Sequence, residues 1–431
     1  MADVLGRAGA WCGQNKYLSA IKNAFQNFMP LTIAGAIGVL WCNVLVNDQT
    51  GLGLFFKPIM ALDFLNPAFQ AVNFCTISCI TVGITLGIAQ EIGVWNMGAE
   101  RAGYIPGLVG LAAWLSVTNT SHMVDGAKEA FTGIAGNELG ATGLFTGMII
   151  GVLSVELFCF FEKQDALKIK MPEQVPPGVA RAFEVLVPAT ITLIITACIG
   201  SACYNLTGLY LNDVIKNGIQ GPLGAVGATI PGVMIIYLVI MLFWLVGIHG
   251  NNMLSAVKEA LFTPLALENV EKFNKGEKPT NIINMYALQM WGEFGGSGVT
   301  IGLVIAIMIF GKREDNKAIA TLSLVPGLFN INETVTFGIP MVLNPILGIP
   351  FVVAPLVTII IGYVLTVIGF CPVACLTVPW TTPPIVFGFL ACGANVMGAV
   401  TQAILIVVST VIYVPFLISY EKYQNKQAAE A

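Results

Sequence analysis

The polar segment 330–333 reads Asn-Ile-Asn-Glu and lies between two apolar stretches, 324–329 and 335–340. The side-chain amides of Asn330 and Asn332 can each donate and accept hydrogen bonds, which suits the hydroxyls of a sugar. The carboxylate of Glu333 can accept a proton in the manner of a general base. If the flanking apolar stretches lie inside a membrane, as the composition described below predicts, an ionisable side chain between them is costly and indicates a functional site. The alternative is structural: Glu333 accepts hydrogen bonds from backbone amides in a turn.

A second polar segment, 247–252, reads Gly-Ile-His-Gly-Asn-Asn and ends a long apolar run. Glycines on both sides of His249 let the backbone leave helical geometry and expose polar groups to a ligand. The asparagines that follow, Asn251 first, favour a polar pocket. The alternative is a histidine that lies at the membrane interface and has no ligand.

The third segment, 291–298, reads Trp-Gly-Glu-Phe-Gly-Gly-Ser-Gly and opens another apolar run. Small residues such as Gly296 and Ser297 permit close backbone approach, and amides at a helix start can donate to an oxygen-rich ligand. Close packing between helices through small residues is the alternative. A nucleotide-binding loop is excluded, because the pattern GxxxxGK[ST] is absent.

The fourth segment, 378–384, reads Val-Pro-Trp-Thr-Thr-Pro-Pro. Its prolines prevent a regular helix. The indole of Trp380 can stack on one face of a pyranose ring, and Thr381 adds a hydroxyl. A tryptophan of the membrane interface beside a structural turn is the alternative.

Apolar runs of spanning length recur along the whole chain. Hydrophobic residues make up 56% of the 431 residues and charged residues 10%, and the mean hydropathy is +0.80. Charged residues form about a quarter of an ordinary soluble domain, and about 20 apolar residues cross a bilayer core. The composition predicts an all-α polytopic membrane protein. The runs expected to span are 28–48, 70–94, 102–119, 139–161, 184–206, 227–248, 286–311, 351–370 and 396–420.

The cysteines and histidines give no sign of a metal or redox centre. Ten cysteines form no CxxC pair, and there are only two histidines. We therefore interpret the cysteines as small buried hydrophobes and expect neither a metal nor a cofactor. Residues 1–25 are amphipathic and lack the compact apolar run of a signal peptide.

Lysine and arginine concentrate in alternate loops, which predicts that both termini are cytoplasmic. The basic segments 250–281 and 312–317 would then both lie inside, so the run 286–311 cannot be one simple crossing. Re-entrant or broken helices must occur here, and such backbone is tolerated only inside protein or along a polar cavity. The four polar segments are therefore expected to form one site from discontinuous helices. A proline-containing cytoplasmic linker, 163–183, separates an N-terminal portion, residues 1–183 with the linker included, from a C-terminal portion, residues 184–431.

At these residues the chain resembles the membrane-embedded IIC components of the bacterial sugar phosphotransferase system, in particular the lactose, cellobiose and diacetylchitobiose group. The resemblance covers nearly the whole chain. The family's usual Asn-Glu-Pro reads Asn-Glu-Thr at 332–334, which keeps the carboxylate but relaxes the turn. The motifs that carry it are 15–23, 29–31, 247–250, 295–298, 327–333, 343–347 and 379–384.

The resemblance implies a homodimer in the bacterial cytoplasmic membrane, with ten transmembrane helices and two re-entrant hairpins. Residues 1–183 would be the dimerisation scaffold, and residues 184–431 would contain the transport domain that moves against it in an elevator mechanism. The sugar is imported and phosphorylated in one coupled process, with phosphate from a phosphocysteine on IIB, which IIA charges. Neither IIB nor IIA is recognisable in the sequence, so both are expected as separate chains.

The resulting hypothesis is that a β-linked disaccharide binds at the four polar segments. Glu333 would act as the base on the sugar's C6 hydroxyl, and His249 would orient that hydroxyl or stabilise phosphoryl oxygens. A proton- or ion-coupled sugar symporter, with Glu333 carrying the proton, is the main alternative; an enzyme acting on lipid-linked sugars is another. Cellobiose, lactose and diacetylchitobiose stay equally open. The expected ligand contacts are Asn251, Asn330, Asn332, Trp380, Thr381, Gly296 and Ser297.

Overall fold

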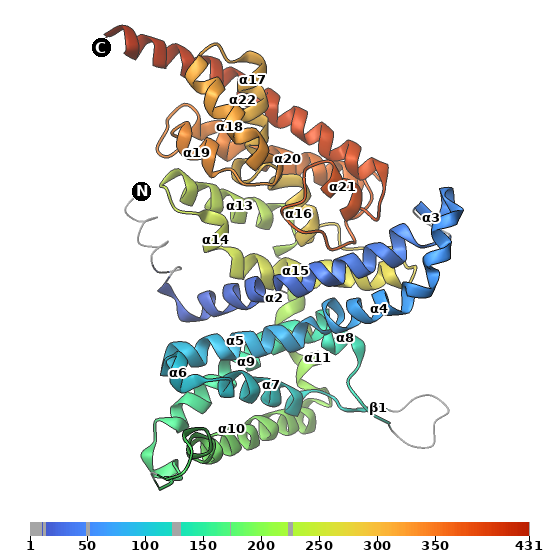
Figure 1. Cartoon of the computed structure of the whole chain (residues 1–431), viewed down its shortest axis with the longest axis vertical. Coiled ribbons are helices and arrows are strands. Elements are labelled where there is room, and N and C mark those ends of the chain that lie inside the picture. The colour runs from blue at the N-terminus through green and yellow to red at the C-terminus, as the bar shows by residue number, and fades with distance from the viewer. Residues whose placement is uncertain are drawn as a thin grey trace. The chain divides into compact units, whose positions relative to one another are not determined.

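The structure is a computed structural model of the chain, and it describes residues 11, 14–48, 52–122, 131–172, 174–222 and 227–430. Most of the amphipathic stretch 1–25 that precedes Lys16 lies outside these residues. Helices make up nearly all of the regular structure (Figure 1). The described residues contain one small sheet, an antiparallel pair of strands β1 (Ser121–His122) and β2 (Phe131–Thr132).

The chain divides into two compact units. The N-terminal unit consists of Gln14–Gly35 and Val72–Gly224, and the C-terminal unit consists mainly of Ala36–Ala71 and Ala225–Ala431. The border after Gly224 separates groups of residues that contact one another in the structure, whereas the linker at 163–183 was placed from its prolines and charges in the sequence. The assignment of dimerisation to residues 1–183 and of transport to residues 184–431 stays a prediction.

The long helices of the N-terminal unit pack through glycines. A Cβ on Gly147 of α9 would come 2.2 Å from Thr85 Oγ1 of α5, and a Cβ on Gly110 of α7 would come 2.3 Å from the Ala89 Cβ of α5. Such close approach is typical of helices that associate inside a membrane. The helices are α2 (Lys16–Leu40, which continues into the other unit), α5 (Ile80–Met97), α6 (Ala99–Ala102), α7 (Ile105–Val117), α8 (Gly136–Leu139), α9 (Ala141–Glu162), α10 (Pro177–Thr207) and α11 (Leu211–Ile215).

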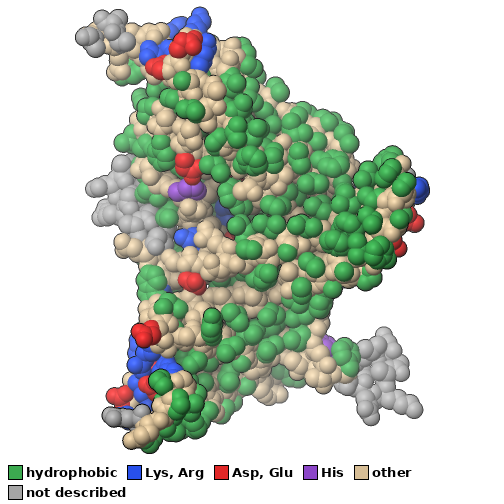
Figure 2. Space-filling model, in the orientation of Figure 1, with side chains coloured by type: hydrophobic (Ala, Val, Ile, Leu, Met, Phe, Trp, Pro, Cys, Tyr) green, Lys and Arg blue, Asp and Glu red, His purple; other side chains and the backbone are tan. Residues whose placement is uncertain are grey.

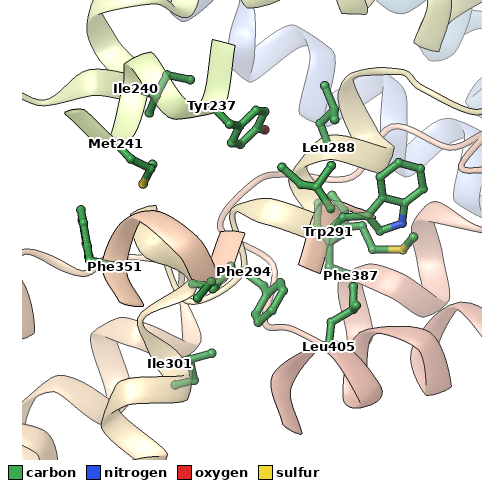
Figure 3. Packing of buried hydrophobic residues seen from close by; sticks show 14 of the residues in the cluster. Tyr237, Ile240, Met241, Leu288, Trp291, Phe294, Ile301, Phe351, Phe387 and Leu405 are labelled. Atoms are coloured by element: carbon green, nitrogen blue, oxygen red, sulfur yellow. The ribbon is translucent and has the colours of Figure 1, made fainter. Parts of the chain in front are cut away.

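The C-terminal unit holds a large buried core of aromatic and aliphatic side chains, shown in Figure 3. Tyr237 and Met241 of α13, Trp291 of α16 and Phe351 of α20 contribute to it. The helices are α3 (Leu52–Phe55), α4 (Asn66–Cys75, which continues into the other unit), α13 (Ile230–Leu245), α14 (Gly250–Met253), α15 (Ser255–Asn274), α16 (Met285–Gly292), α17 (Ile301–Phe310), α18 (Glu314–Leu328), α19 (Glu333–Gly338), α20 (Gly348–Val367), α21 (Val386–Ala391) and α22 (Val396–Glu430).

Short 3-10 and π segments complete the helical elements. Among them, the π segment Trp41–Leu45 continues α2, and the 3-10 turn Ile77–Cys79 precedes α5. The others are Lys57–Leu65, Asp165–Leu167, Lys216–Gln220 and Ser297–Val299.

The helices agree with an all-α polytopic membrane protein. Six helical stretches among the described residues are long and apolar enough to cross a bilayer, and α16 with α17 would make a seventh. Two shorter apolar helices, α7 and α13, have 13 and 16 residues. The count of ten spans therefore stays a prediction. The six stretches are Lys16–Leu45, Lys57–Met97, Ala141–Glu162, Pro177–Thr207, Gly348–Val367 and Val396–Gln427.

Helices begin and end near most of the predicted spans, with one clear difference. The run expected at 28–48 starts earlier, because α2 already begins at Lys16. Lys16 is held in place by an ion pair with Glu156, in which Nζ and Oε1 are 2.6 Å apart. A charged residue with a partner inside the protein can continue a helix that hydropathy alone would start later.

The run 286–311 is broken, as the distribution of positive residues predicted. Helices α16 and α17 meet at a bend of 59°. Between them Gly295, Gly296 and Gly298 adopt positive φ angles of 69°, 87° and 77°. These angles suit glycine and strain other residues. A Cβ on Gly298 would also come 2.4 Å from Phe351 Cδ2, so the break depends on glycine at this position.

We predict that Gly298→Ala destabilises the fold more than Gly208→Ala. Both glycines have a positive φ, and a Cβ there costs about 1–2 kcal/mol. Only at Gly298 would the Cβ also meet a core side chain, since nothing lies within 4 Å of it at Gly208. Overpacking adds roughly 1–3 kcal/mol. Thermal unfolding of the purified variants in detergent measures the difference, and equal midpoints would contradict this account of the break.

Candidate functional site

The side chain of Asn330 connects three of the four polar segments predicted to form the site. Its Oδ1 accepts a hydrogen bond from the Gly295 N–H at 2.6 Å. Its Nδ2 donates to the carbonyl oxygens of Trp380 at 2.5 Å and Thr382 at 3.1 Å. Asn330 has a φ of 63°, a left-handed conformation that asparagine adopts more readily than most residues. These bonds occupy both amide hydrogens, so the side chain fixes the segments, and direct contact with a ligand stays a prediction.

Asn332 holds the loop against one of these segments, 291–298. Its side chain is buried, and Nδ2 donates to the Ser297 carbonyl at 2.9 Å and to Thr336 Oγ1 at 3.1 Å. A Cβ on Gly296 would come 2.6 Å from the Asn332 Cβ. Glycine at 296 therefore lets the backbone approach Asn332 closely, as expected of the small residues in this segment. A contact between Gly296 and a ligand stays a prediction.

Glu333 and His249 face each other. Glu333 begins α19, and its Oε1 lies 3.8 Å from His249 Nε2, with 46% and 37% of the two side chains exposed. His249 precedes α14, and its Nδ1 accepts a hydrogen bond from the Asn252 N–H at 3.2 Å. A neutral ring that accepts at Nδ1 carries its proton on Nε2, so its N–H points towards Glu333. The Trp244 ring packs against the imidazole, with 4.4 Å between ring centroids.

Three further residues predicted to contact the ligand differ in how accessible their side chains are. Asn251 lies on α14, and its Oδ1 is buried without a hydrogen-bond partner among the described residues. A buried acceptor without a partner costs about 1–3 kcal/mol, which makes this oxygen a strong acceptor for a ligand hydroxyl. Trp380 is 44% exposed, so some of its indole is free to stack. Thr381 is half-buried.

The structure adds a buried ion pair that the sequence interpretation missed. Lys258 Nζ pairs with Glu293 Oε1, and the Tyr237 hydroxyl donates to the same oxygen at 2.6 Å. Lys258 is only 5% exposed. The sequence interpretation counted residues 250–281 as a cytoplasmic loop, whereas most of them form α15.

A signal for this lysine was present in the sequence. Lys258 is followed at intervals of four by Phe262, Ala266 and Val270, all of them buried. This spacing is the apolar stripe of an amphipathic helix. A lysine on such a stripe requires a partner inside the protein, and Glu293 was the nearest unexplained carboxylate in the polar segments.

Together the four segments make a polar site inside the C-terminal unit. Figure 2 shows a histidine directly beside acidic side chains, with hydrophobic and uncharged groups around them. The site offers an exposed indole, a carboxylate that faces an imidazole, an unpaired amide oxygen and a buried ammonium group. Such a set can bind a polyhydroxylated ligand and assist proton movement at one of its hydroxyls.

Comparison with known proteins points to one family. The model of the family described as "Phosphotransferase system, EIIC" matches residues 22–355. The oligo-beta-mannoside-specific EIIC component of Bacillus subtilis is 33% identical over 413 residues, covering 95% of this chain and 90% of that protein. The cellobiose-specific EIIC component of Lactococcus lactis is 30% identical, covering 99% and 98%.

One solved structure is similar over nearly the whole chain. The crystal structure of the transporter ChbC, the IIC component from the N,N'-diacetylchitobiose-specific phosphotransferase system, superimposes with a TM-score of 0.88. The two chains share 29% sequence identity, and the match covers 97% of each. The fold of nearly the whole chain is thus one that a solved transporter also has.

We predict that Asn330→Ala lowers the stability of the protein by roughly 2–3 kcal/mol, because it removes three hydrogen bonds worth about 1 kcal/mol each. Thermal unfolding in detergent provides the measurement. Asn205→Ala is the matched control, since the exposed Asn205 makes a single long side-chain hydrogen bond to Ser201 at 3.5 Å. Equal unfolding midpoints for the two variants would show that Asn330 does not connect the segments in solution.

Proposed function

This chain belongs to the EIIC family of the phosphotransferase system, and on that premise we propose that it imports a β-linked disaccharide and presents it for phosphorylation. It is a multi-pass membrane protein with several helices of spanning length. The similar proteins are named for oligo-beta-mannoside, cellobiose and diacetylchitobiose, all of them β-linked sugars. The proposed location is the bacterial cytoplasmic membrane, with both termini cytoplasmic.

The proposed pocket lies at the four polar segments. Trp380 stacks on an apolar face of the sugar, and Asn251 Oδ1 accepts from a hydroxyl. Asn330 and Asn332 orient the backbone of the segments, and their remaining lone pairs add acceptors. Residues Gly296, Ser297 and Thr381 complete the lining. The exposed indole and the unpaired amide oxygen support this assignment.

The observation that carries the chemical proposal is the opposition of Glu333 and His249 at 3.8 Å. The C6 hydroxyl of the sugar donates to the Glu333 carboxylate, while the His249 N–H donates to the same hydroxyl oxygen or to a phosphoryl oxygen. As the oxygen attacks phosphorus, its proton passes to Glu333. The new bond is O–P, and the S–P bond of the IIB phosphocysteine breaks, so that a thiolate leaves. Positioning and charge stabilisation suffice for such a transfer.

The proposal includes partners. IIB donates the phosphoryl group and IIA recharges it, and both are expected as separate chains. Two copies of the chain form a homodimer through residues 1–183, surrounded by lipid. Residues 184–431, which contain the pocket, carry the sugar across in an elevator movement. The glycine-mediated packing of α5, α7 and α9 supports a rigid scaffold.

We predict that Glu333→Gln slows phosphorylation by roughly 10²–10⁴-fold, the usual contribution of a general base. The amide keeps the size of the side chain, so the affinity for the disaccharide should fall by less than about tenfold, which is about 1.4 kcal/mol. The rate is measured with phosphorylated IIB and radiolabelled cellobiose, and the affinity by isothermal titration.

Two results would contradict the proposed function. Phosphorylation by the Gln variant at the unmodified protein's rate would remove Glu333 from the role of base. Uptake of unmodified sugar into vesicles that lack IIB, driven by a pH gradient, would instead show a proton-coupled symporter.

We predict that Trp380→Ala weakens sugar binding by roughly tenfold, since aromatic stacking contributes about 0.5–1.5 kcal/mol beyond burial. Trp95→Ala serves as the control. Trp95 is 58% exposed and belongs to the N-terminal unit. Isothermal titration with cellobiose, lactose and diacetylchitobiose measures both variants. Unchanged affinity of the Trp380 variant for all three sugars would place the binding site elsewhere.

A further inference from the structure

The proposed transfer leaves one electrostatic requirement unmet. A transferring phosphoryl group carries negative charge on its oxygens, and proteins stabilise it with lysine, arginine or a metal ion. Glu333 is an anion and would repel this charge, and a neutral His249 offers one N–H. The pocket therefore requires a cation close to the pair.

Lys258 is the cation that the structure pairs with one of the polar segments, through Glu293. It is the one lysine or arginine that is buried among the described residues, at 5% exposure. It lies in the first turn of α15. The preceding helix, α14, begins directly after His249. His249 faces Glu333, and only this short helix and Leu254 separate it from α15.

Contacts with the broken helix fix the position of Lys258. Its Nζ pairs with Glu293 Oε1, and it lies 5.6 Å from the centre of the Tyr237 ring, whose hydroxyl bonds to the same carboxylate. Glu293 comes two residues before Gly295, the residue bound by Asn330. The ion pair is thus linked through the backbone to the loop that carries Glu333.

A buried ion pair of this kind is poorly explained by stability alone. The removal of two charges from water costs several kcal/mol per ion, and apolar replacements are often neutral or stabilising. A lysine that pairs with a singly charged carboxylate can, however, leave it for an anion of higher charge. A phosphoryl group of higher charge competes well for it, because attraction scales with the product of the charges.

We propose that Lys258 binds the phosphoryl oxygens during transfer, and that Glu293 and Tyr237 hold it in position beforehand. The proposal rests on the proposed phosphorylation of the sugar at this site. Lys258 acts only as a hydrogen-bond donor: its Nζ leaves Glu293 for a phosphoryl oxygen, and Glu293 keeps the hydrogen bond from Tyr237. The proton of the C6 hydroxyl still passes to Glu333, and the thiolate of IIB still leaves.

The test separates a role in transfer from a structural role. Lys258→Gln leaves Glu293 buried without its cation, so it is compared with the double variant Lys258→Gln/Glu293→Gln, in which both partners are neutral and of similar size. Glu293→Gln keeps the lysine, and Lys258→Arg keeps the charge. Each variant is assayed for cellobiose affinity by isothermal titration, and for kcat with phosphorylated IIB, expressed per sugar-binding site.

The expected result is that the double variant binds cellobiose within about threefold of the unmodified protein, yet loses at least ~10²-fold in kcat, as when a transition-state donor is removed. Glu293→Gln should retain kcat within about tenfold, and Lys258→Arg should exceed the double variant by about tenfold or more. If Lys258 were only a structural partner of Glu293, the double variant would not lose kcat while it keeps its affinity for cellobiose.

Two outcomes would overturn the proposal. Recovery of the full kcat in the double variant would show that Lys258 only neutralises Glu293. Loss of cellobiose binding in the double variant would show that the pair maintains the pocket. Failure of the proposed function itself would look different, because the unmodified protein would then form no sugar phosphate with phosphorylated IIB.

Discussion

The hydrogen bonds of Asn330 are the interaction on which the rest of the site depends. Broken helices leave backbone groups without helical partners, and inside a membrane those groups have no water to bind. Here the Gly295 N–H and the carbonyls of Trp380 and Thr382 all find a partner in one side-chain amide. An unsatisfied backbone group in such surroundings costs several kcal/mol. Asn330 therefore stabilises the broken segments by giving these groups a partner.

This constraint explains why chemically active groups occur at the same place. A continuous apolar helix presents only side chains, whereas the bend of 59° between α16 and α17 brings backbone and small residues close to the loop at 330–333. Asn332 closes that loop against Ser297. Glu333, the next residue, starts a new short helix and stays accessible beside His249. Rigid neighbours on both sides thus orient the Glu333 carboxylate, which remains accessible.

Much of this could be predicted from the sequence because a bilayer imposes simple rules. The lengths of the apolar runs predicted the positions of most helices, and the distribution of lysine and arginine predicted that 286–311 is not one simple crossing. The glycines at 295–298 were expected to permit close backbone approach, and the structure places the break at them. The four polar segments were correctly expected to include residues that meet, and three of them do so at Asn330. These inferences depend on composition and spacing, which sequence displays directly.

Other features depend on which side chains meet, and spacing alone does not determine that. Asn330 and Asn332 were expected to read a ligand, whereas the structure shows their amide hydrogens bound to backbone and to Thr336. Lys258 was treated as a loop charge, since positive residues near span ends usually mark the cytoplasmic side. Its partner lies 35 residues away, directly after the end of α16. Helical periodicity would have shown its burial, but only the packing of α13, α15 and α16 identifies Glu293 and Tyr237 as its neighbours.

The most direct test of the account is a density map of the protein with cellobiose bound. The account predicts sugar density inside the C-terminal unit, with one ring against Trp380 and the C6 hydroxyl within hydrogen-bond distance of Glu333. Asn251 Oδ1 should then have a sugar hydroxyl as its partner. Sugar bound in the N-terminal unit, or bound with Glu333 out of reach of any hydroxyl, would contradict the central claim that the four polar segments form the transport site.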